Sequence, residues 1–202
     1  MSSAVVSWVS SKGVADRAAS YGVPIQSAVS MRDEWETKRL GNVADVIAGQ
    51  SPAGKFYNAS ARGLPFYQGK KAFRERFIGP AVTWTTQVTK EAHPGDILMS
   101  VRAPVGPVNF ATERACIGRG LAAIRCRGEI SREFLFYVLL NKQGEIAGRE
   151  GAVFASINKA EIEAIDLPVP SLTEQRRIVA ILDEAFADIA KARANAEQNL
   201  RN

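Results

Sequence analysis

The sequence predicts an α+β fold, in which a globular domain with a twisted mixed β-sheet and short helices is followed by one long C-terminal helix. Three observations lead to this prediction. Short apolar runs bounded by Gly and Pro recur between Glu34 and Arg127, as is typical of short strands. A compact apolar segment lies at 131–141, with Ser131 as its expected N-cap and Gly144 just beyond its end. Residues 172–200 then carry one uninterrupted helical pattern of the coiled-coil type.

The composition is that of a soluble globular protein. The chain has 202 residues, 46% of them hydrophobic and 23% charged, which suffices for one sizeable domain plus an appendage. The longest apolar run, Phe134–Leu140, is far shorter than a membrane span, and the N-terminal segment lacks the features of a secretory signal. Two cysteines and one histidine do not supply a disulfide scaffold or a structural zinc site. We therefore expect a cytoplasmic protein without a metal site.

Positive charge is concentrated in the middle of the chain. The net charge is +5, but the segment from Lys55 to Arg127 contains twelve Lys or Arg against four Asp or Glu. The segment from Ser171 onward contains five of each. A concentrated positive field favours polyanions, nucleic acid first. The alternative is a basic surface that only keeps the protein soluble.

The chain divides into three parts. Residues 1–30 are rich in Ser, Ala and Val without a sustained period, and we expect a loosely ordered extension there. Residues 31–170 form the globular domain, and residues 171–202 form the long helix. Within the domain, a short element at 34–50 leads into a strand and turn, and a short strand at 63–67 leads into the 68–71 loop.

The segment from Gln68 to Thr89 interleaves four cations with three aromatic residues and ends in a Thr-rich strand. Cations contact phosphates, while guanidinium, amide and hydroxyl groups can hydrogen bond to base edges. The segment therefore favours a nucleic-acid contact. The alternative is an amphipathic hairpin whose aromatic residues face the core while its cations are only solvated. We prefer this alternative for the aromatic residues, and we favour a functional contact for the cations.

Two further loops each present an arginine. A turn and a buried strand at 95–101 precede a rigid loop in which two prolines follow Arg102, which either contacts a ligand or bridges carbonyl groups. The segment 116–124 contains the pattern G-x-G-x-x-A. Because a strand rather than a helix follows it, we reject a nucleotide site and expect a turn between two strands, with Arg119 at its tip.

The C-terminal helix has a clear start and an apolar seam. Pro170 cannot continue a helix backwards, and Ser171 is the expected N-cap. A helix from Leu172 to Leu200 would be about 43 Å long. Its lower seam is mostly alanine, which allows a second helix to approach closely but buries little area, so we expect a partner helix. The alternative is an ordinary helix folded onto its own domain. The expected packing residues are Ile178, Leu182, Ala185, Phe186, Ile189, Ala192 and Ala196.

The sequence shows no catalytic constellation. The single histidine, His93, has no evident nucleophile, and the acidic residues form no metal-ligand cluster of recognisable spacing. We therefore expect no catalytic residue in this chain.

Several of these segments together resemble the specificity subunit of type I restriction–modification systems. The resemblance covers about residues 32–200. It is carried by Trp35 with Arg39-Leu40-Gly41, GDILMSVRAPVG at 95–106, CIGRGLAAI at 116–124, GAVFASINKAEIEAI at 151–165, and LPVPSLTEQRRIVAILD at 167–183. The last segment is the most specific of the five.

This resemblance implies a target-recognition domain at 31–170, a spacer or dimerisation helix at 171–202, and no catalysis in this chain. The implied partners are double-stranded DNA, methyltransferase subunits that carry S-adenosylmethionine and methylate adenine, a restriction subunit that translocates with ATP, and a second specificity half bound through the helix. The family usually has two recognition domains and two helices, so the chain is expected to be either the N-terminal half of a longer subunit or a half-size subunit that dimerises through its helix. A basic protein-interaction module and a self-contained DNA-modifying enzyme are the rival hypotheses.

The expected DNA contacts are chosen from position and chemistry, because the recognition residues of the family vary among its members. They are Lys55, Tyr67, Gln68, Lys70, Lys71, Arg74, Arg76, Thr85, Thr86, Gln87, Arg102 and Arg119.

Overall fold

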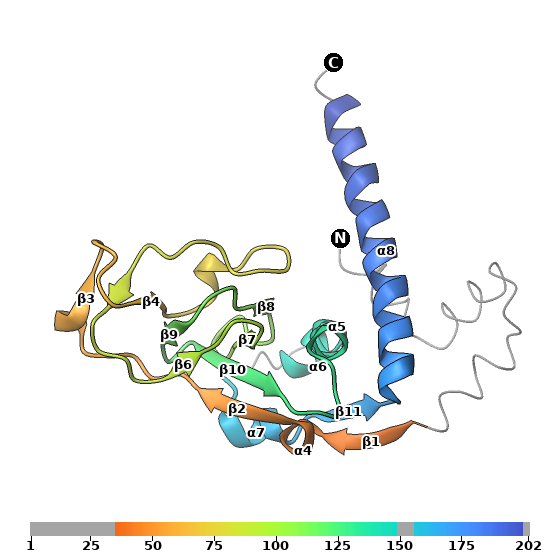
Figure 1. Ribbon diagram of the computed structural model, residues 1–202, viewed down its shortest axis with the longest axis horizontal. Coiled ribbons are helices and arrows are strands. Elements are labelled where there is room, and N and C mark those ends of the chain that lie inside the picture. Colours follow the sequence, from red (N-terminus) through yellow and green to blue (C-terminus); the bar gives the residue numbers. More distant parts are fainter. Residues whose placement is uncertain (1–34, 149–155, 200–202) are drawn as a thin grey trace, which may run out of the picture.

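The computed structural model describes residues 35–148 and 156–199. The extension expected at 1–30 lies outside the described residues. The first elements are β1 (Glu36–Arg39), α4 (Leu40–Val43), β2 (Ala44–Ala48), η1 (Gly54–Phe56), β3 (Tyr57–Asn58), β4 (Leu64–Tyr67), η2 (Lys70–Ala72), β5 (Trp84–Thr85) and β6 (Glu91–Ala92). They are followed by β7 (Ile97–Ser100), β8 (Val108–Phe110), β9 (Ala115–Ile117), β10 (Leu121–Cys126), α5 (Arg132–Asn141), α6 (Gln143–Ile146), α7 (Lys159–Glu163), β11 (Asp166–Val169) and α8 (Leu172–Asn199). Short elements precede one long helix (Figure 1), so the predicted α+β architecture is confirmed.

A four-stranded antiparallel sheet, ordered β2-β10-β7-β8, runs through the globular part, hereafter the head. Successive side chains of a strand point to opposite faces of the sheet. Ile97 and Met99 of β7 accordingly join one apolar cluster with Ile124 of β10, whereas Leu98 and Ala123 join a second cluster. The sheet is therefore buried on both faces along most of β7 and β10, which explains the continuous apolar runs Ile97–Met99 and Leu121–Ile124.

The second sheet has five short strands in the order β3-β5-β4-β9-β6. Its β4 and β9 run parallel, with Phe66 opposite Cys116, and the other pairs are antiparallel. The sheet is mixed, as predicted. β3 and β5 lie at the end of the head that is remote from α8 (Figure 1).

A two-stranded ribbon pairs the first strand of the head with its last strand. β1 and β11 pair antiparallel, with Glu36 opposite Val169 and Arg39 opposite Asp166. The ribbon lies beside the start of α8 (Figure 1). The chain therefore enters and leaves the head at one place.

The predicted turn at 118–120 is confirmed between β9 and β10. The Gly118 N–H donates to the Tyr67 carbonyl at 2.9 Å, and the Gly120 N–H donates to the Gln68 carbonyl at 3.1 Å. A Cβ atom at Gly120 would meet the Gln68 carbonyl oxygen at 2.5 Å, closer than real Cβ atoms approach. Glycine is thus required here for the close approach of two backbones rather than for binding a nucleotide.

Both expected helix caps are present. The Ser131 hydroxyl accepts a hydrogen bond from Phe134 N at 3.2 Å, and α5 follows. The Ser171 hydroxyl accepts one from Glu174 N at 3.3 Å, and α8 follows. Each cap satisfies a backbone donor that the helix itself leaves unpaired. The Glu174 carboxylate bonds to the Arg177 guanidinium at 2.7 and 2.8 Å.

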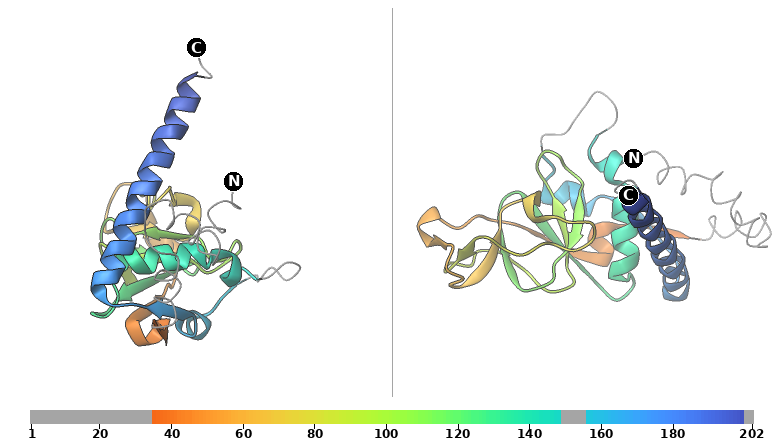
Figure 2. Two further views of the ribbon diagram at one scale, coloured as in Figure 1. Left: turned by 90° about the vertical axis from the view of Figure 1, so that its right-hand side faces the viewer. Right: turned by 90° about the horizontal axis from the view of Figure 1, so that it is seen from above.

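The two halves of α8 have different surroundings. In the first half, Ile178, Leu182 and Phe186 pack against the head beside α5. From Ala187 to Asn199 every residue is exposed. At 1.5 Å per residue the whole helix is about 42 Å long, and its second half projects away from the head (Figures 1 and 2). Among the described helices, none is long and apolar enough to cross a membrane.

Candidate nucleic-acid interface

Ion pairing separates the basic residues of the head into two groups. Of the twelve Lys and Arg between Lys55 and Arg127, four form salt bridges with acidic side chains: Arg76 with Asp183, Arg114 with Glu91, Arg125 with Asp96, and Arg127 with Asp45. The other eight form no salt bridge with a described residue, and all eight are exposed: Lys55, Arg62, Lys70, Lys71, Arg74, Lys90, Arg102 and Arg119. The second group includes six of the twelve predicted DNA contacts.

Backbone hydrogen bonds bring three basic loops together around the turn at 118–120. Gly120 N donates to the Gln68 carbonyl, which places the Lys70–Lys71 loop beside the turn. Val101 N donates to the Gly120 carbonyl at 3.0 Å, so the loop that carries Arg102 starts there too. We call Gln68, Lys70, Lys71, Arg102 and Arg119 the basic edge. Its residues come from three separate parts of the sequence, and backbone hydrogen bonds place their loops side by side.

A second group of predicted contacts lies at the β3–β5 end of the head. Thr86 N donates to the Phe56 carbonyl at 3.2 Å, which places Thr86 and Gln87 beside η1 and Lys55. The Lys55 ammonium lies 5.1 Å from the centre of the Phe56 ring. Thr86, Gln87 and Lys55 are all exposed, so this end combines hydrogen-bonding side chains with a cation.

Tyr67 and Thr85 are buried inside the head, with 4% and 0% of their surface exposed. The Tyr67 hydroxyl donates to the Gly79 carbonyl at 3.0 Å, and burial, followed by the nearby Glu113 carboxylate, raises its pKa to about 12. The Thr85 hydroxyl donates to the Gln87 carbonyl at 3.0 Å. Both side chains are satisfied within the fold, so we do not retain them among the proposed contacts.

Arg76 and Arg74 are two residues apart but point to different surroundings. The Arg74 side chain is exposed, while its backbone N–H is held by the Asn109 side chain at 2.8 Å. The Arg76 guanidinium instead donates to the Asp183 carboxylate of α8 at 2.7 Å. Sequence spacing could not separate the two, because Asp183 lies 107 positions further along the chain.

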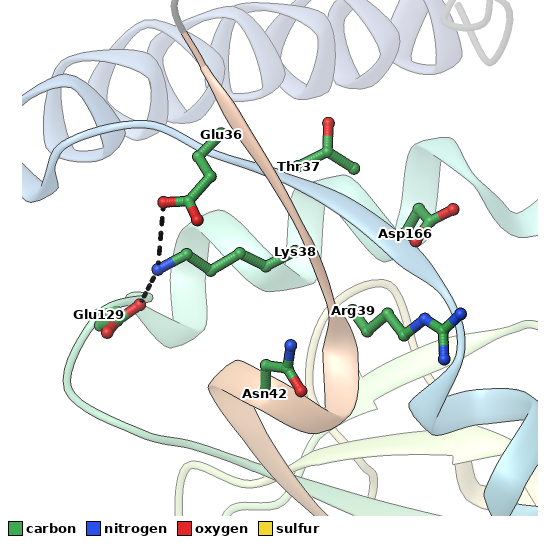
Figure 3. Close-up of a pocket in the computed structure, with 7 residues that line it drawn as sticks. All are labelled: Glu36, Thr37, Lys38, Arg39, Asn42, Glu129 and Asp166. Atoms are coloured by element: carbon green, nitrogen blue, oxygen red, sulfur yellow. Dashed lines mark hydrogen bonds and ion pairs between the residues drawn. The ribbon is translucent and has the colours of Figure 1, made fainter.

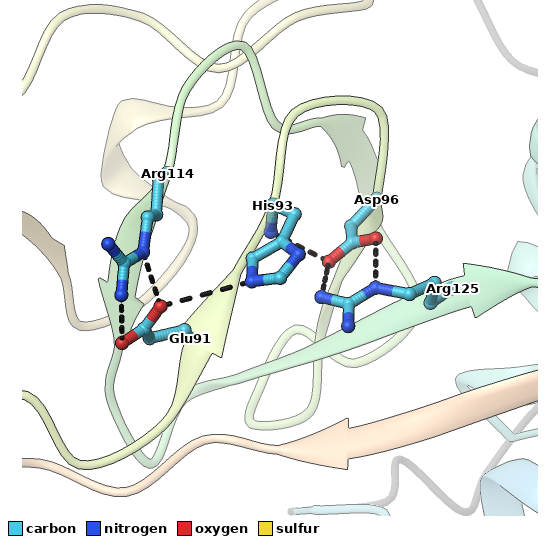
Figure 4. Close-up of polar contacts among 5 residues, drawn as sticks. All are labelled: Glu91, His93, Asp96, Arg114 and Arg125. Atoms are coloured by element: carbon cyan, nitrogen blue, oxygen red, sulfur yellow. Dashed lines mark hydrogen bonds and ion pairs between the residues drawn. The ribbon is translucent and has the colours of Figure 1, made fainter.

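Sequence reasoning missed a polar network beneath the G-D-I-L segment (Figure 4). The buried Asp96 carboxylate accepts two hydrogen bonds from Arg125, at 2.8 and 3.0 Å, and one from His93 N at 2.8 Å. Nearby, Arg114 donates to Glu91 at 2.6 and 2.9 Å, and this hydrogen bonding lowers the pKa of the Glu91 carboxyl. Asp96 and Arg125 hold the turn before β7 against β10, whereas Glu91 and Arg114 join β6 to the start of β9. Both pairs are structural.

The role of Gln175 was also missed. Its side chain is fully buried, its amide nitrogen donates to the Glu129 and Pro170 carbonyls at 2.8 and 2.9 Å, and its carbonyl accepts from Ser131 N at 2.8 Å. The amide therefore ties the first turn of α8 to the start of α5. The sequence offered one signal for this role: Gln175 is an uncharged polar residue among Glu174, Arg176 and Arg177 in the first turns of the helix.

An open pocket lies on the β1–β11 ribbon, lined by Glu36, Thr37, Lys38, Arg39, Asn42, Glu129 and Asp166 (Figure 3). Lys38 donates to Glu129 at 2.5 Å and lies 3.3 Å from Glu36, and these two carboxylates raise its pKa, Glu129 most. Cations and carboxylates neutralise one another here, so the pocket lacks the single-sign charge of the basic edge.

The predicted helix-packing residues divide along α8. Ile178, Leu182 and Phe186 are partly buried against the head, and Ala185 is half-buried. Ile189, with 58% of its surface exposed, and Ala192 and Ala196 lie on the projecting half. Within residues 35–148 and 156–199, no group of three or more His, Cys, Asp or Glu side chains could hold a metal ion.

The head has mixed sheets and exposed cations, and the helix that follows it extends beyond it. The chain is therefore a basic α+β protein with a projecting helix. Comparison with known proteins makes the class specific. Residues 32–198 match the sequence model of a family described as the type I restriction modification DNA specificity domain. This chain belongs to that family.

Individual relatives agree. The chain is 39% identical to the specificity subunit named for the type I restriction enzyme MjaX of Methanocaldococcus jannaschii. The alignment of 173 residues covers 83% of this chain and 40% of that subunit. The crystal structure of the HsdS subunit from Thermoanaerobacter tengcongensis superimposes with a TM-score of 0.72 at 43% identity, over 78% of this chain and 38% of HsdS. A structure from work on assembly and conformational transition of the type I R-M system gives 0.76 at 44% identity, over 81% and 41%. The chain thus spans about two fifths of the length of these relatives.

Proposed function

We propose that this chain recognises one half of a split DNA target and holds methyltransferase subunits along α8, without itself catalysing a reaction. The observation that carries the proposal is the basic edge within a specificity-domain fold. Three adjacent loops carry exposed cations there, and these cations form no ion pair with a carboxylate of the described residues. Phosphate contacts from such cations set the register of a protein on DNA, while neutral and guanidinium side chains discriminate bases.

In this proposal Lys70, Lys71, Arg102 and Arg119 bind phosphates. Gln68, Arg74 and, at the far end of the head, Gln87 with Thr86 are the groups that could enter the major groove. These eight side chains are all exposed, and so is the side chain of Lys55, which lies beside Thr86 and Gln87. The rest of the system lies on other subunits: methyltransferases that carry S-adenosylmethionine, and a restriction subunit that uses ATP. A cytoplasmic location on chromosomal DNA belongs to the same proposal.

The second half of the target requires a second head. The proposal supplies it through the projecting half of α8, either from another copy of the chain or from a further segment of a longer subunit. The exposed Ile189, Ala192 and Ala196 form the surface that a second helix would cover. Small side chains there would let two helix backbones approach closely.

The experiment is selection of duplexes from a random pool by the full chain bound to its methyltransferase subunit. We expect enrichment of one sequence, and expect Lys71→Ala with Arg119→Ala to weaken its binding and to reduce the salt dependence by about two counterions. Lys159→Ala, on α7 against α4 and β2, is the control that removes one exposed positive charge elsewhere. Retention without sequence preference, or retention of an acidic protein instead, would replace DNA recognition by a protein-interaction role. Transfer of methyl groups by the chain alone would make it an enzyme.

A further inference from the structure

The segment from Phe73 to Gly79, which carries the exposed Arg74, is attached to the head through its backbone. Phe110 N donates to the Arg76 carbonyl at 2.9 Å, and Ile78 N donates to the Phe110 carbonyl at 3.0 Å. The Asn109 side chain bonds both backbone groups of Arg74, at 2.8 and 2.9 Å. The segment is therefore a defined surface, and the yellow trace between β4 and β5 in Figure 1 extends from the head toward α8.

Arg76 connects this surface to α8. Its Nη1 atom lies 2.7 Å from Asp183 Oδ1 and 3.4 Å from the Tyr137 hydroxyl of α5. The Tyr137 hydroxyl donates to the same Asp183 oxygen, and the Tyr137 ring stacks on Phe186 of α8 with 5.6 Å between ring centres. One carboxylate on the helix thus receives hydrogen bonds from a loop and from a second helix.

The guanidinium is surrounded by aromatic rings. The centres of the Phe77, Phe110, Phe136 and Tyr137 rings lie 5.5–6.0 Å from its central carbon. The side chains of Arg76 and Asp183 are 31% and 43% exposed. Partial removal of water strengthens both the cation–π contacts and the ion pair, and lowers their sensitivity to salt. A cation engaged in this way is not available to a phosphate.

We propose that Arg76 is a positioning residue, which together with Asp183 and Tyr137 fixes the Phe73–Gly79 surface relative to α8. The proposal rests on the function proposed above. If partners assemble on α8 and Arg74 contacts DNA, then this junction sets where the DNA lies relative to those partners. Its loss would impair recognition although no DNA contact is removed.

A distance measurement tests the junction without DNA. Spin labels are placed on Glu75→Cys and Ala190→Cys, both exposed positions, in a full-length chain whose Cys116 and Cys126 are replaced by alanine. We expect one narrow distance distribution, which broadens or shifts when Asp183→Asn is added. The control is Asp188→Asn, the same chemical change five residues along the helix, where the Asp188 carboxylate forms a single ion pair among the described residues, with Lys191 at 3.7 Å. An unchanged distribution in Asp183→Asn would overturn the proposal.

DNA binding gives the functional test, with the duplex enriched from the random pool by the unaltered complex. Removing a carboxylate makes a protein more positive, so electrostatics alone predicts that Asp183→Asn binds DNA as well or better. Positioning predicts the opposite: a loss on the order of tenfold for Asp183→Asn and for Arg76→Ala, no further loss in the double variant, and an unchanged salt slope.

In the DNA-binding test, two results would overturn the inference. The first is an Asp183→Asn variant that binds the duplex as tightly as the unaltered chain. The second is a salt slope that falls by about one in Arg76→Ala, since that fall indicates the loss of a phosphate contact. Should the unaltered complex enrich no duplex, the proposed function fails, and the distance measurement still decides whether Arg76 fixes the surface.

Discussion

At the scale of single residues, partners distinguish a structural arginine from a candidate contact. Arg74, Arg76, Arg114 and Arg125 all belong to one basic stretch of sequence. Only Arg74 projects from the surface without an acidic partner among the described residues, although it bonds the Phe73 carbonyl at 3.2 Å. The Arg125 guanidinium is held by Asp96, and this hydrogen bonding raises its pKa further. Charge counted along the sequence therefore overstates the charge that is available to DNA.

Arg74→Ala tests this distinction. If Arg74 contacts a base, its loss should weaken binding of the enriched duplex by about 1–3 kcal/mol and relax specificity at one position. Arg114→Ala, which removes an arginine already paired with Glu91, should change affinity far less. Fluorescence anisotropy titrations at several salt concentrations measure both. Equal affinities and equal salt slopes for unaltered and Arg74→Ala protein would remove this segment from the interface.

Gln175→Glu tests the buried amide at the start of α8. A glutamate has nearly the same shape but lacks the NH₂ donors, so the Glu129 and Pro170 carbonyls lose their hydrogen bonds and a carboxyl group is buried. We expect a loss of about 2–4 kcal/mol in the free energy of unfolding. Chemical denaturation measures it. Arg176→Glu changes the exposed neighbour and should cost far less; similar stabilities for the two variants would contradict the assigned role.

At the scale of elements, α8 combines two kinds of helix. Its first half is an ordinary amphipathic helix, because Ile178, Leu182 and Phe186 complete the apolar cluster of the head. Its second half has no described neighbour, although Ile189 repeats the same spacing. The sequence predicted one continuous packing seam for a partner. The structure instead assigns the start of that seam to the head itself and leaves the remainder exposed.

Paired substitutions separate the two halves. Ile189→Asp should abolish association with a second helix or with the methyltransferase while leaving the melting temperature of the head unchanged. Ile178→Asp should lower the free energy of unfolding by several kcal/mol, since it introduces a charge against an apolar cluster. Light scattering measures the association, and thermal denaturation measures the stability of the head. An unaltered assembly in Ile189→Asp would exclude this face as the contact.

Local rules predicted much of the fold, because they act over a few residues. The caps at Ser131 and Ser171, the strand after Gly95 and the turn at 118–120 are all present. The Thr-rich segment was predicted as a strand, yet only Trp84–Thr85 forms one. The candidate interface was less predictable. Whether a side chain is buried, as at Thr85, or paired, as at Arg76, depends on residues distant in sequence.

At the scale of the whole molecule, the described residues form one head and one projecting helix. Two copies joined through their helices would present two identical heads, whereas a longer subunit would present two different ones. Under the proposed function, one copy of the chain recognises one half-target in either case. The symmetry of the complete target therefore depends on what covers the helix.

Mapping adenine methylation in cells with and without the gene tests this. We expect a split motif that is present only when the chain is expressed. A symmetrical motif would indicate two copies, and an asymmetrical one would indicate a second, different head. If deletion of the gene left every methylation motif in place, the proposed function would be wrong.

The antiparallel pairing of Glu36–Arg39 with Asp166–Val169 has a consequence for evolution. Because the residues between these strands start and finish at a single junction, the intervening stretch can be exchanged as one cassette, as domains with adjacent termini tolerate transplantation. The helix keeps its direction when the donor retains the residues that bond α8, such as Arg76 and Tyr137, which bond Asp183. A hybrid that carries residues 40–165 from such a relative should adopt the donor's target while keeping the recipient's assembly. New specificities could then arise by recombination at two short sites instead of by gradual substitution.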